Sequence, residues 1–111
     1  MREQSVGLNV VANTLTTVYT VPSGYYAKWN LMYVFNGTGS TKSFTAYWHD
    51  SSANADIYVL NQNNVSSKEY VKMDGGAYVV LEEGDTVKVQ SEAGSTFSII
   101  CTFELEKKQG I

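Results

Sequence analysis

The sequence contains few of the residues that perform chemistry or link protein chains covalently. Its 111 residues include one cysteine, one histidine and one proline, and Arg2 is the only arginine. A single cysteine excludes a disulfide within the chain, which is typical of a protein that stays in a reducing cytoplasm. No apolar run approaches the ~18 residues of a membrane-spanning helix, so we expect no membrane partner. The polar start precedes no apolar segment, which predicts a complete gene product without a signal peptide.

Charged residues are also scarce, and the acidic ones outnumber the basic ones. They make up 17% of the chain and leave a formal net charge of −3, whereas about 25% is usual in soluble domains. Phosphate recognition requires clustered lysine and arginine, and the lysines of this chain are scattered. The sequence therefore predicts no nucleic-acid partner.

The residues that remain give little basis for catalysis. His49 ends a predicted strand beside Asp50, and Cys101 falls on the inward side of another, where a cysteine behaves as an inert small hydrophobe. The paired carboxylates of residues 82–85 surround a turn, where such groups are solvated rather than gathered in a cleft. We therefore expect no enzyme, no metal site and no cofactor.

What the chain has instead is a repeated strand pattern. Alternating apolar and polar residues, and short apolar runs, recur between clusters of Gly, Asn, Asp and Ser, as expected for strands and turns. The predicted strands are 6–12, 16–21, 25–35, 42–50, 57–60, 68–73, 77–81, 86–91 and 96–106. This spacing predicts one all-β domain over residues 1–111, an antiparallel β-sandwich of about eight strands that is jelly-roll-like or, alternatively, immunoglobulin-like.

Alternation also predicts which side chains enter the core, because neighbouring residues of a strand point to opposite faces. In strand 25–35 the expected inward residues are Ala27, Trp29, Leu31, Tyr33 and Phe35. In strand 42–50 they are Phe44, Ala46 and Trp48. The last predicted strand alternates most regularly, which indicates an antiparallel sheet with one face in water.

Both ends and two polar segments are expected outside the sandwich. Residues 1–6 are predicted to form an extended arm, and residues 107–111 a frayed tail. Residues 51–56 are predicted as a loop and residues 61–67 as a polar connection. Like the arm, these two segments are suited to reach over a neighbouring surface, since unpaired backbone can add a strand to another protein.

Tyrosine is the one residue type whose abundance calls for an explanation. Six tyrosines fall at strand ends or on the side opposite the expected core: Tyr19, Tyr25, Tyr26, Tyr47, Tyr58 and Tyr78. Tyrosine is enriched at protein interfaces, because its ring covers area while its hydroxyl keeps a polar partner. The general preference of strands for tyrosine is the alternative explanation. We take the six as the predicted interface residues.

Two segments resemble a known family. Residues 15–24 read Leu-Thr-Thr-Val-Tyr-Thr-Val-Pro-Ser-Gly, which contains a T-x-Y-x-V-P-x-G pattern ahead of a long apolar strand. Residues 80–89 contain Leu81, Gly84, Asp85 and Val87 in an L-x-x-G-D-x-V hairpin pattern. This order, over about residues 15–105, resembles small virion proteins of tailed bacteriophages.

The resemblance implies a structural decoration, cement or staple protein, without enzymatic activity, on the outside of an icosahedral capsid. Its partners would be the major capsid protein and a second copy of itself, because a self-complementary face on a capsid two-fold axis makes a dimer. Such a protein would be assembled in the cytoplasm of the bacterial host and end on the outer surface of the virion.

Two other classes of function compete with this one. A carbohydrate-binding or tail-fibre adhesin module predicts exposed rings beside amide and carboxylate groups, whereas Trp29 and Trp48 are expected inside. A cupin-like enzyme needs several inward histidines for its metal, and the single histidine of this chain disfavours it.

Overall fold

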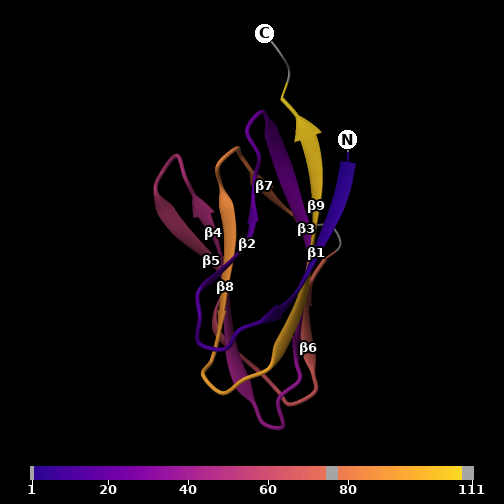
Figure 1. Cartoon of the computed structure of the whole chain (residues 1–111), viewed down its shortest axis with the longest axis vertical. Coiled ribbons are helices and arrows are strands. Elements are labelled where there is room, and N and C mark those ends of the chain that lie inside the picture. The colour runs from indigo at the N-terminus through magenta and orange to yellow at the C-terminus, as the bar shows by residue number, and fades with distance from the viewer. Residues whose placement is uncertain (1, 75–77, 109–111) are drawn as a thin grey trace.

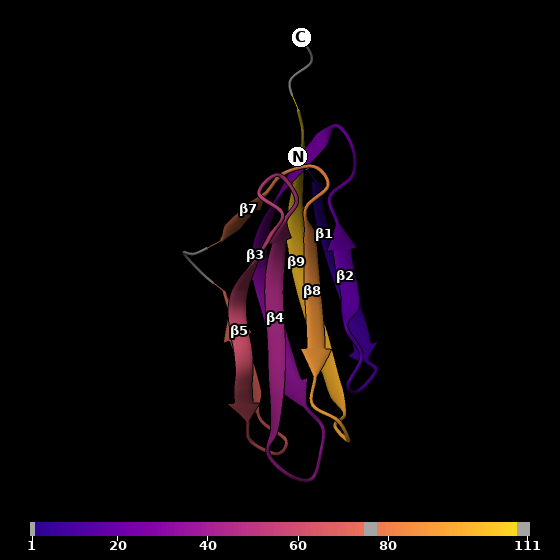
Figure 2. The same cartoon turned by 90° about the vertical axis from the view of Figure 1, so that its left-hand side faces the viewer.

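Two antiparallel β-sheets face each other in a sandwich (Figure 1). The computed structural model describes residues 2–74 and 78–108. The strands are β1 (Arg2–Val10), β2 (Thr16–Thr20), β3 (Tyr25–Asn36), β4 (Lys42–Asp50), β5 (Ala55–Val65), β6 (Tyr70–Met73), β7 (Val79–Leu81), β8 (Thr86–Ser91) and β9 (Phe97–Lys107). One sheet, here the β3 sheet, has the order β1-β9-β3-β6, with β7 also paired to β3. The other, the β4 sheet, has the order β2-β8-β4-β5, seen face-on in Figure 2.

The strand order is that of a jelly roll. The pairs are nested: β1 with β9, β2 with β8, β3 with β6 and β7, and β4 with β5. Consecutive strands β1 and β2 lie in different sheets, whereas the first two strands of an immunoglobulin domain are neighbours in one sheet. The predicted all-β sandwich is confirmed, and its topology is the predicted jelly-roll-like one and not the immunoglobulin-like alternative. None of the described residues belongs to a helix long and apolar enough to span a membrane.

The core lies between the sheets and is built from alternate residues of the central strands. Its largest fully buried side chains include Trp29, Phe44, Phe97 and Phe103. Trp29 is therefore inside as predicted, while Trp48 is partly buried at the margin of the core. Apolar burial of this kind contributes roughly 25 cal/mol per Å² and dominates the stability of such a domain.

The inward side of β3 differs from the prediction because the strand contains a β-bulge. The pairing of β3 with β9 shifts register between Trp29 and Leu31. An extra residue in one strand exchanges the two faces beyond it. Trp29 is buried as expected, but beyond the bulge Met32 and Val34 are buried instead. The expected inward residues Leu31, Tyr33 and Phe35 consequently lie on the outer face of the β3 sheet, which corrects the sequence-based prediction.

Parts of the chain ends and of the polar segments, which were predicted to lie outside the sandwich, belong to strands. Arg2 to Val6 of the predicted arm belong to β1 and pair with β9, so they are not a free arm. Lys107 closes β9, and the Lys108 N–H donates to the Gly24 carbonyl at 2.8 Å, so these two residues are not frayed. Residues 1, 77 and 109–111, which fall in the predicted arm, in a predicted strand and in the tail, lie outside the described residues.

Strand β5 replaces the predicted short strand, part of the loop before it and most of the connection after it. It runs from Ala55 to Val65 and pairs with β4 along its length, with register shifts on either side of Ala46. Polar residues fit there because β5 is an edge strand whose outer face meets water.

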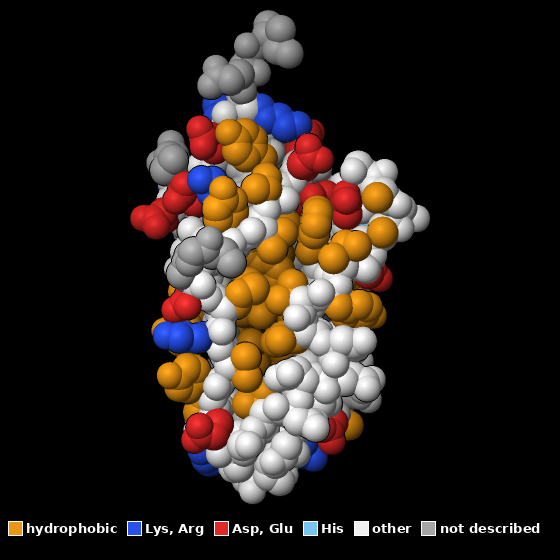
Figure 3. Space-filling model, turned by 180° about the vertical axis from the view of Figure 1, so that it is seen from behind, with side chains coloured by type: hydrophobic (Ala, Val, Ile, Leu, Met, Phe, Trp, Pro, Cys, Tyr) orange, Lys and Arg blue, Asp and Glu red, His pale blue; other side chains and the backbone are white. Residues whose placement is uncertain are grey.

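The two edges of the sandwich, where the rims of the two sheets lie opposite each other, differ in how near the edge strands approach. Strands β1 and β2 approach each other on one side. On the opposite side, where β5, β6 and β7 are the edge strands, a band of hydrophobic side chains is visible between the sheets (Figure 3). The partly buried hydrophobic residues of these three strands are Val59, Leu60, Val71, Met73 and Val79.

Candidate functional site

The six predicted interface tyrosines do not form one surface. Tyr19 lies between the sheets and stacks on Phe103, with ring centroids 4.1 Å apart. Burial raises its pKa. Tyr25 also packs against the core. These two predicted interface residues therefore pack against the core of this chain.

Tyr26 and Tyr78 lie on the outer face of the β3 sheet. Tyr26 is half-buried and pairs across the sheet with Glu106. Tyr78 is 52% exposed, and the Lys28 ammonium lies 5.0 Å from the centroid of its ring. This arrangement is a surface cation–π contact, and it leaves one face of the tyrosine in solvent.

Tyr47 and Tyr58 are the two predicted residues that the structure brings together. They sit opposite each other on β4 and β5, on the outer face of the β4 sheet, with centroids 5.3 Å apart and rings inclined by 62°. Tyr58 is 53% exposed, whereas Tyr47 is only 8% exposed. Burial, followed by the nearby Asp56 carboxylate, raises the pKa of Tyr47. The pair forms a wall, with Tyr47 as its fixed part and Tyr58 as its accessible part.

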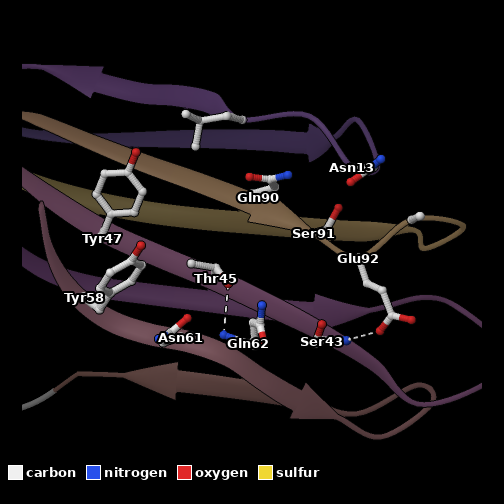
Figure 4. A pocket seen from close by; sticks show the side chains of 12 residues that line it. Asn13, Ser43, Thr45, Tyr47, Tyr58, Asn61, Gln62, Gln90, Ser91 and Glu92 are labelled. Carbon is white, nitrogen blue, oxygen red and sulfur yellow. Dashed lines mark hydrogen bonds between the residues drawn. The ribbon is translucent and has the colours of Figure 1, made fainter.

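A pocket of about 400 Å³ adjoins this wall. Figure 4 shows side chains of β4, β5 and β8 around it, together with Asn13 from the turn after β1. Four carboxamides line it: Asn13, Asn61, Gln62 and Gln90. We call it the amide pocket. No sequence pattern predicts it, because its residues come from four separate segments.

A bulge in β5 supplies two of these carboxamides. The register of β4 against β5 shifts between Phe44 and Ala46, so Asn61 and Gln62 both lie at the irregularity. Gln62 has a φ of 50°, and its backbone N–H donates to Thr45 Oγ1 at 2.9 Å (Figure 4). In a regular strand these neighbours would point to opposite faces.

Glu92 is the charged group in the lining, and its charge is compensated. The carboxylate accepts a hydrogen bond from the Ser43 N–H at 2.9 Å and lies 3.6 Å from the Lys42 ammonium. The bond from Ser43 is the main reason that the pKa of Glu92 is lowered. The rest of the lining consists of neutral side chains, so the pocket presents hydrogen-bonding groups without net attraction for an anion.

The outer face of the β3 sheet has a different character. Beyond the bulge, β3 and its neighbours place Leu31, Tyr33, Phe35, Tyr70 and Ile100 side by side, a group we call the apolar face. Phe35 pairs with Tyr70, and Tyr33 pairs with Ile100. Phe35, Tyr70 and Ile100 are 40%, 57% and 47% exposed. Contiguous exposed apolar residues of this kind are typical of contact surfaces.

The one cysteine and the one histidine of the chain lie in different surroundings. Cys101 is completely buried, as expected, and burial raises the pKa of its thiol to about 12. His49 Nδ1 lies 2.6 Å from Asp56 Oδ1 at the surface. Within residues 2–74 and 78–108, no three His, Cys, Asp or Glu side chains are grouped so as to hold a metal ion.

Asp85 is the most heavily hydrogen-bonded carboxylate. It accepts bonds from the indole N–H of Trp48 at 3.0 Å, from the Glu82 N–H at 2.9 Å, and from the N–H and hydroxyl of Ser51 at 3.0 and 2.9 Å. Burial alone raises the pKa of Asp85, but these bonds outweigh burial and hold the pKa below its usual value. Asp85 therefore fastens β8 to the ends of β4 and β7.

No family model and no curated protein matches the chain. Among solved structures, it is similar to one from Bacillus endospore appendages, described as a novel family of disulfide-linked pili, with a TM-score of 0.52 and 16% identity over 97% of this chain and 88% of that one. It is also similar to the globular domain of zebrafish complement 1qA protein, with a TM-score of 0.45 and 15% identity over 90% of this chain and 94% of that one. At such identities the likeness to the pilus protein concerns the fold alone.

Proposed function

We propose that the chain is a structural virion protein that binds the outside of an icosahedral phage capsid and stabilises contacts between major capsid subunits. The observation behind this proposal is the apolar face. Phe35, Tyr70 and Ile100 expose aromatic and aliphatic area side by side on the sheet, and aromatic side chains such as Phe and Tyr are enriched in protein interfaces. The resemblance of residues 15–24 and 80–89 to small phage virion proteins supports the same role.

The surroundings of the apolar face suit docking onto another protein. Lys72 pairs with Tyr33 across the sheet, and Glu104 and Lys28 lie further along the same face. An apolar centre with charged groups at its rim is the usual anatomy of an interface, in which the rim sets orientation and the centre provides affinity. The role requires no reactive group, in keeping with the buried Cys101 thiol.

The proposed assembly is non-covalent. The Bacillus appendages are described as disulfide-linked pili, but Cys101 lies at 0% exposure within the core. A disulfide through Cys101 would require the sandwich to open, so the pilus protein offers a precedent for the fold and not for the linkage.

Self-association through β1 is the second part of the proposal. This nine-residue strand pairs with β9 on one side, and no described strand pairs with its other side. A second copy that adds across this edge in antiparallel orientation gives a two-fold dimer with continuous sheets.

Co-sedimentation with capsid shells tests the proposal. Shells assembled from the major capsid protein of the same genome should retain the parent chain and dissociate at higher temperature with it than without it. The double variant Phe35→Lys, Ile100→Lys should lose at least about tenfold in affinity, because two charges are placed in a desolvated contact. Tyr58→Lys, at a similarly exposed position on the other sheet, is the matched control and should bind as the parent does. Failure of the parent to sediment with shells contradicts the proposal, as does equal binding by the apolar-face variant.

A further inference from the structure

We propose that the amide pocket binds a neutral carbohydrate unit. This inference goes beyond shell attachment, because the pocket lies on the outer face of the β4 sheet and the apolar face lies on the other sheet. A chain attached through its β3 sheet would keep the pocket accessible to solvent.

The tyrosine wall supplies an apolar surface for a sugar ring. Tyr58 is 53% exposed, and Tyr47 packs against it nearly edge-on, with centroids 5.3 Å apart. The contact with Tyr47 restricts the Tyr58 ring without covering its accessible face. A sugar ring presents C–H groups on one side, and these pack favourably against the electron-rich face of an aromatic ring.

The carboxamides supply hydrogen bonds of the kind that hydroxyl groups require. Each of Asn13, Asn61, Gln62 and Gln90 offers two N–H donors and a carbonyl acceptor, and a sugar hydroxyl both donates and accepts. Within the described residues, none of these four side chains makes a hydrogen bond to another protein group. Their donors and acceptors are therefore available to a ligand, and they converge on one pocket beside an aromatic wall.

The charge of the lining selects a neutral ligand. Phosphate, sulfate or carboxylate groups are usually bound by arginine or lysine, and no lysine or arginine lines this pocket. Glu92 is the charged group in the lining, and its charge is compensated by the Ser43 N–H and the Lys42 ammonium, so it offers no attraction for an anion. A volume of about 400 Å³ lies within the usual range of small-ligand sites, roughly 300–1,000 Å³.

Titration of the full chain with neutral sugars tests this inference. Backbone amide NMR shifts are followed while glucose, galactose, mannose and N-acetylglucosamine are each added to millimolar concentration, and an array of neutral and anionic oligosaccharides is screened in parallel. We expect at least one neutral sugar to shift the resonances of Thr45, Gln62 and Gln90. Tyr58→Ala should weaken that binding at least about tenfold, and Asn61→Ala with Gln90→Ala should do the same.

Tyr78→Ala is the matched control, because Tyr78 is 52% exposed and lies on the other sheet. It should leave sugar affinity unchanged. The inference is overturned if no neutral sugar shifts these resonances, if the shifts map to the apolar face, or if only anionic glycans bind. Shell co-sedimentation of the same variants keeps the two proposals separate, since Tyr58→Ala should still sediment with shells.

Discussion

The two outer faces of the sandwich enclose the same core but present different chemistry. The β3 sheet exposes aromatic and aliphatic side chains such as Phe35 and Ile100, while the β4 sheet exposes carboxamides such as Asn61 and Gln90 beside a tyrosine pair. The inner faces are constrained by packing against each other, whereas the outer faces carry no such constraint. The side chains on the two outer faces are therefore the ones expected to set what each face binds.

A β-bulge shapes each of these faces. In β3 the register shift between Trp29 and Leu31 turns a run of apolar residues outward and creates the apolar face. In β5 the irregularity around Asn61 and Gln62 places two adjacent carboxamides in one pocket. One extra residue in a strand thus determines the chemistry of a whole face, as bulges near functional surfaces commonly do.

The largest expected effect comes from a charge placed on the buried face of β3 beyond the bulge, compared with the same charge on its exposed face. Val34→Asp should lower the free energy of unfolding by about 4 kcal/mol or more, because Val34 is completely buried and an unpaired carboxylate is costly there. Phe35→Asp, one residue later, should cost less than about 1 kcal/mol, since Phe35 is on the outer face. Urea unfolding of both variants measures the contrast. If Phe35→Asp were the more destabilising change, β3 would have regular alternation without a bulge. Phe35 would then be buried and would not belong to the apolar face.

A smaller loss is expected at Asp85, whose carboxylate links the start of β8 to the ends of β4 and β7. Asp85→Ala leaves the Trp48 indole and two backbone N–H groups without their acceptor, so unfolding free energy should fall by about 3 kcal/mol. Asp85→Asn keeps the shape and part of the bonding, and it should lose less.

The pH dependence follows from the lowered pKa of Asp85. Above the unfolded pKa of about 3.9, its contribution to stability is fully present. As pH falls below that value, the unfolded state takes up the proton first, and the contribution is gone once pH passes the folded pKa. Thermal melting between neutral and strongly acidic pH should show a steeper acid decline for the parent than for Asp85→Asn. Parallel profiles would mean that Asp85 does not drive the decline.

The smallest effect on stability is expected at Gln62, where a substitution should change the amide pocket without destabilising the fold. Gln62 adopts a φ of 50°, which is unfavourable for a side chain with a Cβ, so Gln62→Gly should leave stability unchanged or raise it by up to about 1 kcal/mol. Sugar binding should weaken while shell binding persists. Gln90→Gly, in the middle of β8, is the control and should cost about 1 kcal/mol. A marked loss of stability in Gln62→Gly would show that its side chain supports the fold.

Sequence patterns predicted the class of fold well and the surfaces poorly. Strand 86–91 was predicted with the bounds of β8, and the alternation of the last strand correctly placed Cys101 inside. Alternation failed beyond Trp29, because a bulge leaves no signature in the apolar pattern of one strand. Tyr19, one of the predicted interface residues, instead stacks on Phe103 of a strand far away in the sequence.

The sequence alone determined that the chain forms an antiparallel β-sandwich, because alternation and turn residues are local properties. Only the tertiary structure decided which tyrosines meet, which side of β3 faces water, and that four distant carboxamides converge on one pocket. The physical reason is that register and bulges are fixed by pairing between strands that are far apart in the chain. Side-chain periodicity within one strand contains no record of that pairing.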